Sequence, residues 1–103
     1  MWAQLITVRL KPGKEGELAG LLERLDAIEQ PGSGLLRHTL LQDVADPSAA
    51  QFLIVFESEE RAREREQDPR RAPGLEDLRT TMADLYDGPP VFTEFNVVAD
   101  RSY

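Results

Sequence analysis

The sequence predicts an α+β domain of the ferredoxin-like kind, a split βαβ sandwich with a four-stranded antiparallel sheet and its helices on one face. Two observations predict it. Four stretches alternate apolar and polar residues as strands do, and two stretches repeat apolar residues at helical spacing. Their order is strand, helix, strand, given twice without a linker, so a single domain is expected over residues 1–103, with its core at about 2–98. Five or six elements could hardly fill the alternative, a three-layer arrangement.

The first strand is expected from Trp2 to Leu10, where apolar residues alternate until the sequence reaches Lys-Pro-Gly. A helix follows from Glu15, because its apolar residues form one stripe and its first turn is acidic. Pro31 and Gly32 end this helix. The stripe consists of Leu18, Leu21, Leu22, Leu25 and Ile28.

Residues 35–43 and 51–57 read as two strands, and the short connection through Asp46 and Pro47 makes them an antiparallel hairpin. A second core helix is expected after Pro73 and before Gly88. A last strand is expected over residues 91–99. The buried face of the second helix consists of Leu75, Leu78, Met82, Leu85 and Tyr86.

The segment 57–71 is highly charged, with six acidic residues and five arginines. Ser58 is expected to cap a helix in which Glu59 and Arg63 form an i, i+4 pair. Only Ala62 is apolar, so the helix cannot be a core element. Two interpretations stay open: a short solvated helix ended by Pro69, or a mobile lid whose arginines reach an anionic or carbonyl-bearing ligand.

The strand at 51–57 is apolar on both faces, although helices can cover only one face of the sheet. The simplest cover for the other face is a second copy of the chain, so we expect a homodimer in which two sheets face each other. The residues expected at this interface are Leu5, Leu53, Val55 and either Phe92 or Phe95.

Composition excludes several classes of function. A net charge of −7 disfavours nucleic acid and anionic membrane surfaces as partners, and the absence of cysteine excludes disulfides, thiolate metal sites and a Cys nucleophile. The first residues read as a strand rather than a signal peptide, and no apolar stretch approaches the roughly 18 residues of a membrane helix. A cytoplasmic location is expected.

The layout resembles the antibiotic biosynthesis monooxygenase (ABM) family of dimeric α+β barrels. The resemblance runs from Trp2 to about Val98 and depends on the order of elements and on short motifs: a tryptophan-led strand, "KPG", "PG", a hairpin with "DP", and "FES" before a lid helix. It implies a dimer that pairs through its sheets. Activities known in the family include cofactor-independent oxygenation of polyketide-like aromatics, haem degradation and isomerisation of small signalling molecules, so the resemblance alone fixes no reaction.

The haem-degrading branch of that family uses an Asn on the first strand, a Trp on the lid helix and a His just beyond it. The corresponding positions here hold Ile6, Arg65 and Leu75. The lid segment also lacks the His that many other members carry there. The resemblance therefore disfavours haem chemistry.

The candidate site residues are isolated. His38, the only histidine, is the candidate catalytic base, although a lone His on a strand is more often structural. Trp2 and Tyr86 are candidate ligand contacts that could equally be core residues. Arg65 is the ligand-binding candidate on the lid, and Asn96, beside Glu94 on the last strand, could orient a ligand or be solvated.

Two classes of function remain. The first is a cofactor-independent monooxygenase, using neither metal nor flavin, that acts on a small aromatic or polyketide-like substrate in a pocket roofed by residues 59–68. The second is a non-catalytic dimer that binds a small molecule or assists a pathway. A cavity of roughly 300 Å³ or more with convergent polar groups would favour a ligand site, whereas a closed, fully apolar space under the lid would favour a structural protein.

Overall fold

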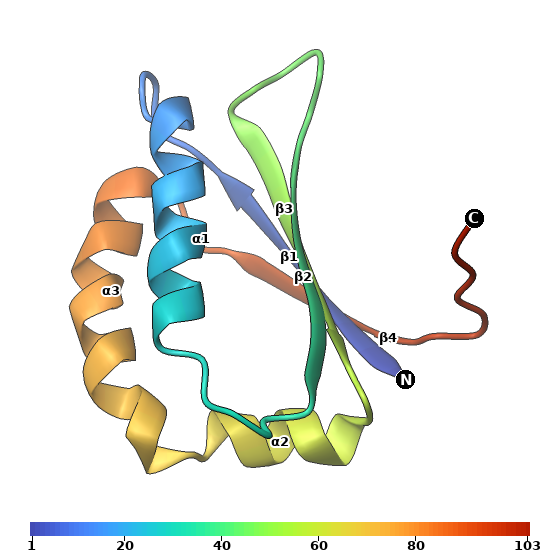
Figure 1. The fold of residues 1–103 in the computed structure, drawn as a ribbon. Coiled ribbons are helices and arrows are strands. Elements are labelled where there is room, and N and C mark those ends of the chain that lie inside the picture. Colours follow the sequence, from blue (N-terminus) through green and yellow to red (C-terminus); the bar gives the residue numbers. More distant parts are fainter.

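The computed structural model describes residues 1–103 and confirms the ferredoxin-like α+β fold. The elements are β1 (Trp2–Arg9), a 3-10 turn (Glu15–Glu17), α1 (Leu18–Ala27), β2 (Leu35–Gln42), β3 (Ala49–Phe56), α2 (Glu59–Glu66), a second 3-10 turn (Pro69–Arg71), α3 (Ala72–Leu85) and β4 (Val91–Asn96). The sheet has the order β2-β3-β1-β4, and every neighbouring pair is antiparallel. Helices α1 and α3 lie side by side on one face of this sheet (Figure 1).

Strand alternation decides which side chains enter the core. In β3 every second residue is buried, and the register places Phe52 opposite Ile6 of β1 and Phe56 opposite Trp2. These residues therefore project from the same face toward the helices. The buried cluster is completed from the helices by Leu18, Leu21, Ala62, Leu78 and Leu85.

The two core helices approach each other closely where Gly74 of α3 meets Ile28, the residue after α1. A Cβ atom on Gly74 would lie 2.3 Å from the Cγ2 atom of Ile28, so the residue without a side chain allows this contact. The buried stripe of α3 begins before the helix itself, because Arg71 lies four residues before Leu75 and is 7% exposed. This arginine is the only buried charged side chain.

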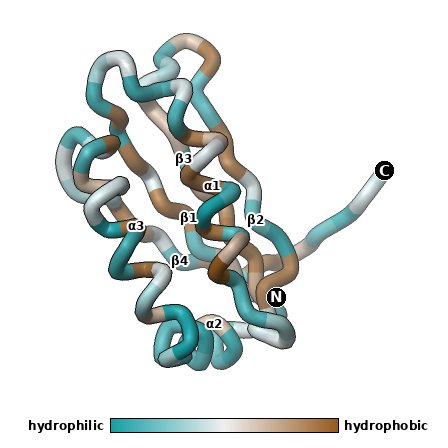
Figure 2. The backbone as a smooth tube through the Cα atoms, turned by 60° about the vertical axis from the view of Figure 1, so that its left-hand side comes forward, coloured by the Kyte–Doolittle hydropathy of each residue, from teal (hydrophilic) through white to brown (hydrophobic).

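Helix α2 crosses one end of the helix and sheet layers (Figure 1), and its tube is almost entirely hydrophilic (Figure 2). The Ser58 side chain accepts a hydrogen bond from the Arg61 N–H, which confirms the expected N-cap. The expected pair of Arg63 with Glu59 is also present, at 3.3 Å. Ala62 is buried, so this polar helix still closes the core with one small side chain.

The opposite face of the sheet carries no helix (Figure 1). Strand register places Leu5, Leu53 and Val55 on this open face, half-buried, together with Phe95, which pairs with Ala3 and is exposed. Phe92 pairs with Ile6 and so lies on the helix face, which leaves Phe95 as the aromatic residue of β4 on the open face. Other exposed apolar residues in this sheet are Leu36, Leu41 and Val91.

No helix in the structure combines the length and the apolar character needed to cross a membrane.

Candidate functional site

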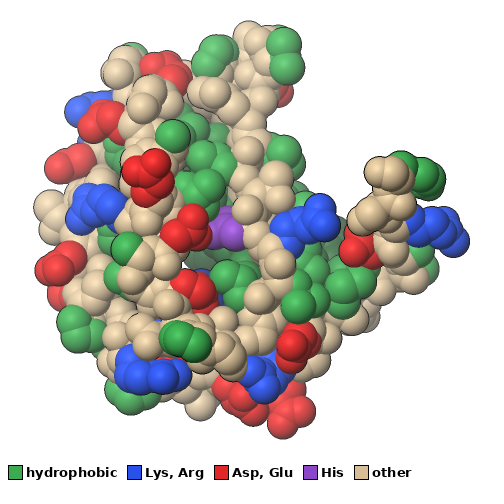
Figure 3. Space-filling model, viewed as in Figure 1, with side chains coloured by type: hydrophobic (Ala, Val, Ile, Leu, Met, Phe, Trp, Pro, Cys, Tyr) green, Lys and Arg blue, Asp and Glu red, His purple; other side chains and the backbone are tan.

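A cavity of about 290 Å³ lies between the sheet and the helices. Figure 3 shows its opening as a hollow beside β2, with the single histidine in purple on the wall and acidic side chains gathered on the side of the helices. All four strands, the three helices and the α3–β4 connection contribute to it. The lining is largely apolar and includes Ile6, Leu25, Phe52, Ile54, Phe56, Leu75, Met82 and Phe92; its polar members are Gln4, His38, Arg65, Glu66, Arg71 and Tyr86.

His38 reaches this cavity from β2, where it pairs with Ile54 and packs its ring 5.7 Å from that of Phe52. Its Nδ1 atom lies 4.0 Å from the Asp26 carboxylate, too far for a hydrogen bond, and its buried Nε2 atom has no partner. Burial lowers the pKa of His38, and the nearby Arg65 charge adds to this effect against the attraction of Asp26. The imidazole is therefore neutral near pH 7 and can accept a proton.

Arg65 enters the cavity from α2 and is held by Glu29, which follows α1. Its Nε and Nη2 atoms donate to both carboxylate oxygens of Glu29, at distances from 2.6 to 3.1 Å. Burial raises the pKa of the Glu29 carboxyl, but the hydrogen bonds from Arg65 and Ser33 and the charges of Arg65 and Arg71 together outweigh it, so the pKa lies below its ordinary value. The Arg65 guanidinium also lies over the Phe56 ring, 5.3 Å from its centre. Its charge is neutralised within the protein.

Arg71 is a functional candidate that was missed from the sequence. It lines the cavity, its Nε atom is buried without a partner, and no carboxylate accepts a hydrogen bond from its guanidinium. Burial lowers its pKa, and the Arg65 charge acts in the same direction. The apolar stripe of α3 could have revealed Arg71. This residue lies four positions before Leu75 and seven before Leu78, so helical spacing extends the buried face of α3 back to it.

Tyr86 stands just after α3 and lines the cavity. This position agrees with the interpretation of Tyr86 as a ligand contact rather than as a core residue alone. A backbone bridge pairs it with Leu10, so the end of α3 is joined to the end of β1. Burial raises the pKa of the Tyr86 hydroxyl to about 12. The phenol consequently stays protonated and can donate a hydrogen bond to a ligand.

Trp2 and Asn96 are not among the residues that line the cavity. Trp2 is buried against Phe56, with ring centres 5.9 Å apart, and the Arg63 guanidinium lies 5.2 Å from the centre of its ring. Asn96 is exposed and pairs with Trp2 at the far end of β1. The neighbouring Glu94 accepts a 2.7 Å hydrogen bond from Arg63. Both candidates therefore belong to the sheet end beyond the cavity.

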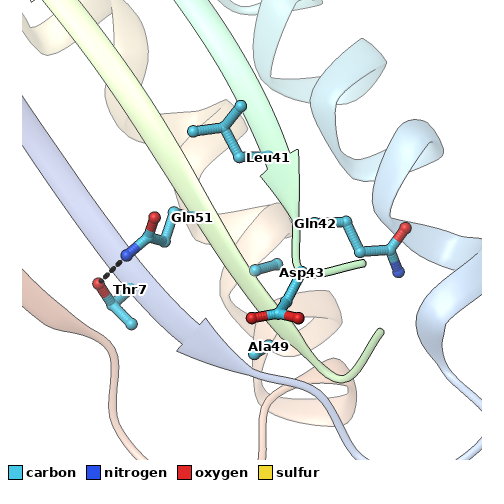
Figure 4. A pocket seen from close by; sticks show the side chains of 7 residues that line it. Thr7, Leu41, Gln42, Asp43, Ala49 and Gln51 are labelled. Atoms are coloured by element: carbon cyan, nitrogen blue, oxygen red, sulfur yellow. Dashed lines mark hydrogen bonds between the residues drawn. The ribbon is translucent and has the colours of Figure 1, made fainter. Parts of the chain in front are cut away.

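A second depression of about 210 Å³ lies near the hairpin between β2 and β3 (Figure 4). Gln51 donates a 3.4 Å hydrogen bond to the Thr7 hydroxyl across it. Asp43 is the only titratable side chain in its lining, and this carboxylate already accepts from the backbone N–H groups of Ala45 and Asp46. With its polar groups engaged in local structure, this depression is the weaker candidate for a functional site.

The fold and cavity together define a class: a ferredoxin-like domain with a mostly apolar ligand-sized cavity under its helices. Within that class, the chain is similar to a protein from Nitrosomonas europaea provisionally named an antibiotic biosynthesis monooxygenase, with a TM-score of 0.73 and 17% identity over 96% of this chain and 100% of that one. It is also similar to a variant of SnoaB, named a cofactor-independent oxygenase from Streptomyces nogalater, with a TM-score of 0.72 and 19% identity over 96% and 94% of the two chains.

A protein of unknown function from Nitrosomonas europaea superimposes equally well, with a TM-score of 0.74 and 20% identity over 99% of this chain and 93% of that one. No family model and no curated protein sequence matches the chain. The resemblance to ABM proteins is thus confirmed as a shared fold along nearly the whole chain. At such identities it carries no statement about activity.

Proposed function

We propose that this protein is a cofactor-independent monooxygenase that acts on a small, flat aromatic substrate. The observation that carries the proposal is a neutral histidine, His38, which lines a largely apolar cavity of about 290 Å³ and whose buried Nε2 atom has no hydrogen-bond partner. A neutral imidazole can remove a proton from an acidic substrate, and an apolar cavity increases the reactivity of the resulting anion by excluding water. SnoaB, which has the same fold, is named as a cofactor-independent oxygenase.

An anthrone illustrates how the reaction balances. His38 takes a proton from the ring methylene, which leaves an enolate. The enolate transfers one electron to O2, and the substrate radical and superoxide combine to form a peroxide anion. His38 returns its proton to this peroxide, which then loses water. One anthrone and one O2 give one anthraquinone and one H2O, so the substrate itself supplies every electron.

The protein's contribution to this chemistry is binding, orientation and a single proton transfer. The flat walls supplied by Phe52, Phe56 and Phe92 suit an aromatic ring. Tyr86 lines the cavity, and its protonated hydroxyl would donate a hydrogen bond to the substrate oxygen on which negative charge develops. Only His38 among the lining residues combines neutrality near pH 7 with a free acceptor nitrogen.

The test is oxygen uptake with anthrone and quinol substrates, compared with boiled protein. We expect uptake by the native protein and a loss of roughly 10²-fold or more in His38→Gln, since a positioned general base contributes about that much. Gln keeps the side chain polar and of similar size, and thermal unfolding of the variant confirms that it is folded. Uptake no greater than that of the boiled control across the substrate panel contradicts the proposal.

The competing proposal is a binding protein without catalysis, which the same cavity would serve. Its supporting observation is that His38 stands alone as a proton acceptor, without a hydrogen-bonded carboxylate to orient it. It would bind the same aromatic molecules stoichiometrically and consume no oxygen. Haem chemistry is not favoured, because the positions where the haem-degrading branch carries Asn, Trp and His hold Ile6, Arg65 and Leu75, which all line the cavity. His38 is the one lining residue of a type that ordinarily binds haem iron, so a stoichiometric change in the haem spectrum on titration would identify it as the ligand.

A further inference from the structure

We propose that Arg71 is the binding site for a carboxylate on the ligand, so that the natural ligand is a flat aromatic monoanion rather than a neutral ring system. This inference relies on the proposed function only in placing the ligand in the cavity. Its starting point is that Arg71 is 7% exposed, lines the cavity and has a buried Nε atom without a partner. A buried guanidinium keeps its proton at any physiological pH, so its charge demands a counterion.

The protein does not supply that counterion. Three carboxylates lie close enough to influence Arg71, namely Glu29, Glu66 and Asp68. Each is hydrogen-bonded to a different arginine: Glu29 to Arg65, Glu66 to Arg63 at 3.2 Å, and Asp68 to Arg70 at 2.7 Å. Every other arginine of residues 57–71 has a carboxylate oxygen within 4.0 Å, so Arg71 is the one guanidinium of this segment without a carboxylate partner.

The position of that cation defines the kind of anion it would bind. The guanidinium presents a planar fork, which matches the two oxygens of a carboxylate. A phosphate dianion is disfavoured, because Glu29 and Glu66, which already lie near Arg71, would repel its second charge. The apolar remainder of the cavity accommodates the ring to which the carboxylate is attached.

If Arg71 were buried for a structural reason alone, we would expect a carboxylate of the protein to pair with it. Arg65, which enters the same cavity, shows what such a partner looks like, since Glu29 holds it with three hydrogen bonds. Arg71 has the burial of a structural arginine without the ion pair that normally accompanies it. A ligand carboxylate would complete the pairing.

Binding of 2-naphthoate and of its neutral analogue 2-naphthamide tests this inference, with affinities measured by calorimetry. Neither compound has an acidic methylene, so neither is oxidised by the proposed reaction. We expect the native protein to bind naphthoate at least about tenfold more tightly than naphthamide. Arg71→Met should remove this preference while retaining affinity for naphthamide, and Arg71→Lys should keep only part of it because Lys lacks the fork.

Arg79→Met is the matched control, because Arg79 is an exposed arginine on α3, the helix that directly follows Arg71, and is paired with Glu76. It should leave the naphthoate preference unchanged. Thermal unfolding without ligand adds an independent measurement: Arg71→Met should melt higher by about a few degrees, since an unpaired buried charge is replaced by an apolar side chain of similar length.

Equal affinity of the native protein for both compounds overturns the proposal, and so does a naphthoate preference that survives in Arg71→Met. A variant that melts lower and binds both compounds as the native protein does would make Arg71 structural. These outcomes are separate from the oxygenase test. A protein that discriminates the carboxylate through Arg71 yet takes up no oxygen keeps the anion site and loses the proposed reaction.

Discussion

Burial has opposite chemical results at His38 and Arg71, the two cavity residues with unpartnered nitrogen atoms. In both side chains burial lowers the pKa. An imidazole responds by losing its proton near neutral pH, whereas a guanidinium cannot, so the first becomes a base and the second remains a cation. One apolar environment thus holds both a neutral imidazole and a cation, which we propose as a proton acceptor and an anion site.

The lowered pKa of His38 predicts a pH-dependent stability. Between its folded pKa and the unfolded value of 6.5, the unfolded chain binds more protons than the folded one, so stability falls as the pH falls below about 6.5. The groups that face His38 are Asp26, Glu29 and Arg65. The pKa of the Glu29 carboxyl lies below its ordinary value of 4.5, so Glu29 produces no change in this window.

Urea unfolding from about pH 5 to pH 8 measures this effect, with His38→Gln as the reference. The free energy of unfolding of the native protein should decrease relative to that of the variant as the pH is lowered. Above about pH 7 the difference should be constant. Parallel curves for the two proteins throughout the range would mean that His38 has its ordinary pKa.

The sequence predicts which face of a strand or helix a residue occupies. It does not predict whether that residue lies near the cavity or at the far end of the same face. The alternation of β1 placed Trp2 and Ile6 on the same side, and the structure agrees, but only Ile6 lies at the cavity. The pairing of Arg65 with Glu29 joins residues 36 apart, and no local pattern reports such a contact. Arg71 was detectable in principle, because it continues the buried stripe of α3, but the charged residues around it concealed that position.

At the scale of elements, the crossing of α1 and α3 depends on a glycine. Gly74→Ala should destabilise the protein by about 1–3 kcal/mol, because the new Cβ would lie 2.3 Å from Ile28 Cγ2 and the helices would have to move apart. Gly20→Ala is the control. Gly20 lies in α1, and a methyl group added there would meet no other part of the protein within 4 Å, so alanine should stabilise the helix by up to about 1 kcal/mol.

Chemical unfolding of the two variants beside the native protein decides the matter. Opposite signs for the same substitution in neighbouring helices would show that packing governs Gly74 and helix propensity governs Gly20. If Gly74→Ala were as stable as the native protein, the close approach of the two helices could be relieved without cost.

The helices and strands were predictable because their periodicities are strong and their ends carry turn residues. Pro31 and Gly32 separate α1 from β2, and Gly88, at a φ of 94°, follows α3. The relative register of distant strands was not predictable. Alternation within β4 shows that Phe92 and Phe95 lie on opposite faces of the sheet, but not which of them lies on the open face. Only the register of β4 against β1 decides this.

At the scale of the whole molecule, we propose a homodimer that pairs through the open faces of its sheets. The open face presents half-buried Leu53 and Val55 between exposed apolar residues such as Leu36 and Phe95. A monomer would leave this patch in water. Burial of roughly 2,000 Å² or more would correspond to an obligate interface.

Sedimentation should give twice the 11.6 kDa mass of one chain at micromolar concentration. Val55→Asp should produce a destabilised monomer or an insoluble protein, since an unpaired carboxylate buried at an interface costs several kcal/mol. Ala19→Asp adds the same charge at an exposed position of α1 and should remain dimeric. A native protein that sediments at the mass of one chain contradicts the dimer.

The two ends of the cavity differ in how they are attached to the sheet. The end near Tyr86 is fixed by backbone hydrogen bonds, from Lys11 N to Leu85 O at 2.8 Å and from Asp87 N to Arg9 O at 2.7 Å. At the other end, one backbone hydrogen bond joins Glu57 N to Gly34 O at 2.9 Å, just before α2 begins. Helix α2 itself is tied to the segment after α1 by side chains, through Arg65 with Glu29 and Arg61 with the Gly32 carbonyl. Side-chain contacts break and re-form faster than strand pairings, so ligand exchange should proceed past α2. The lifetime of a complex would then be set by the opening rate of the Arg65–Glu29 pair.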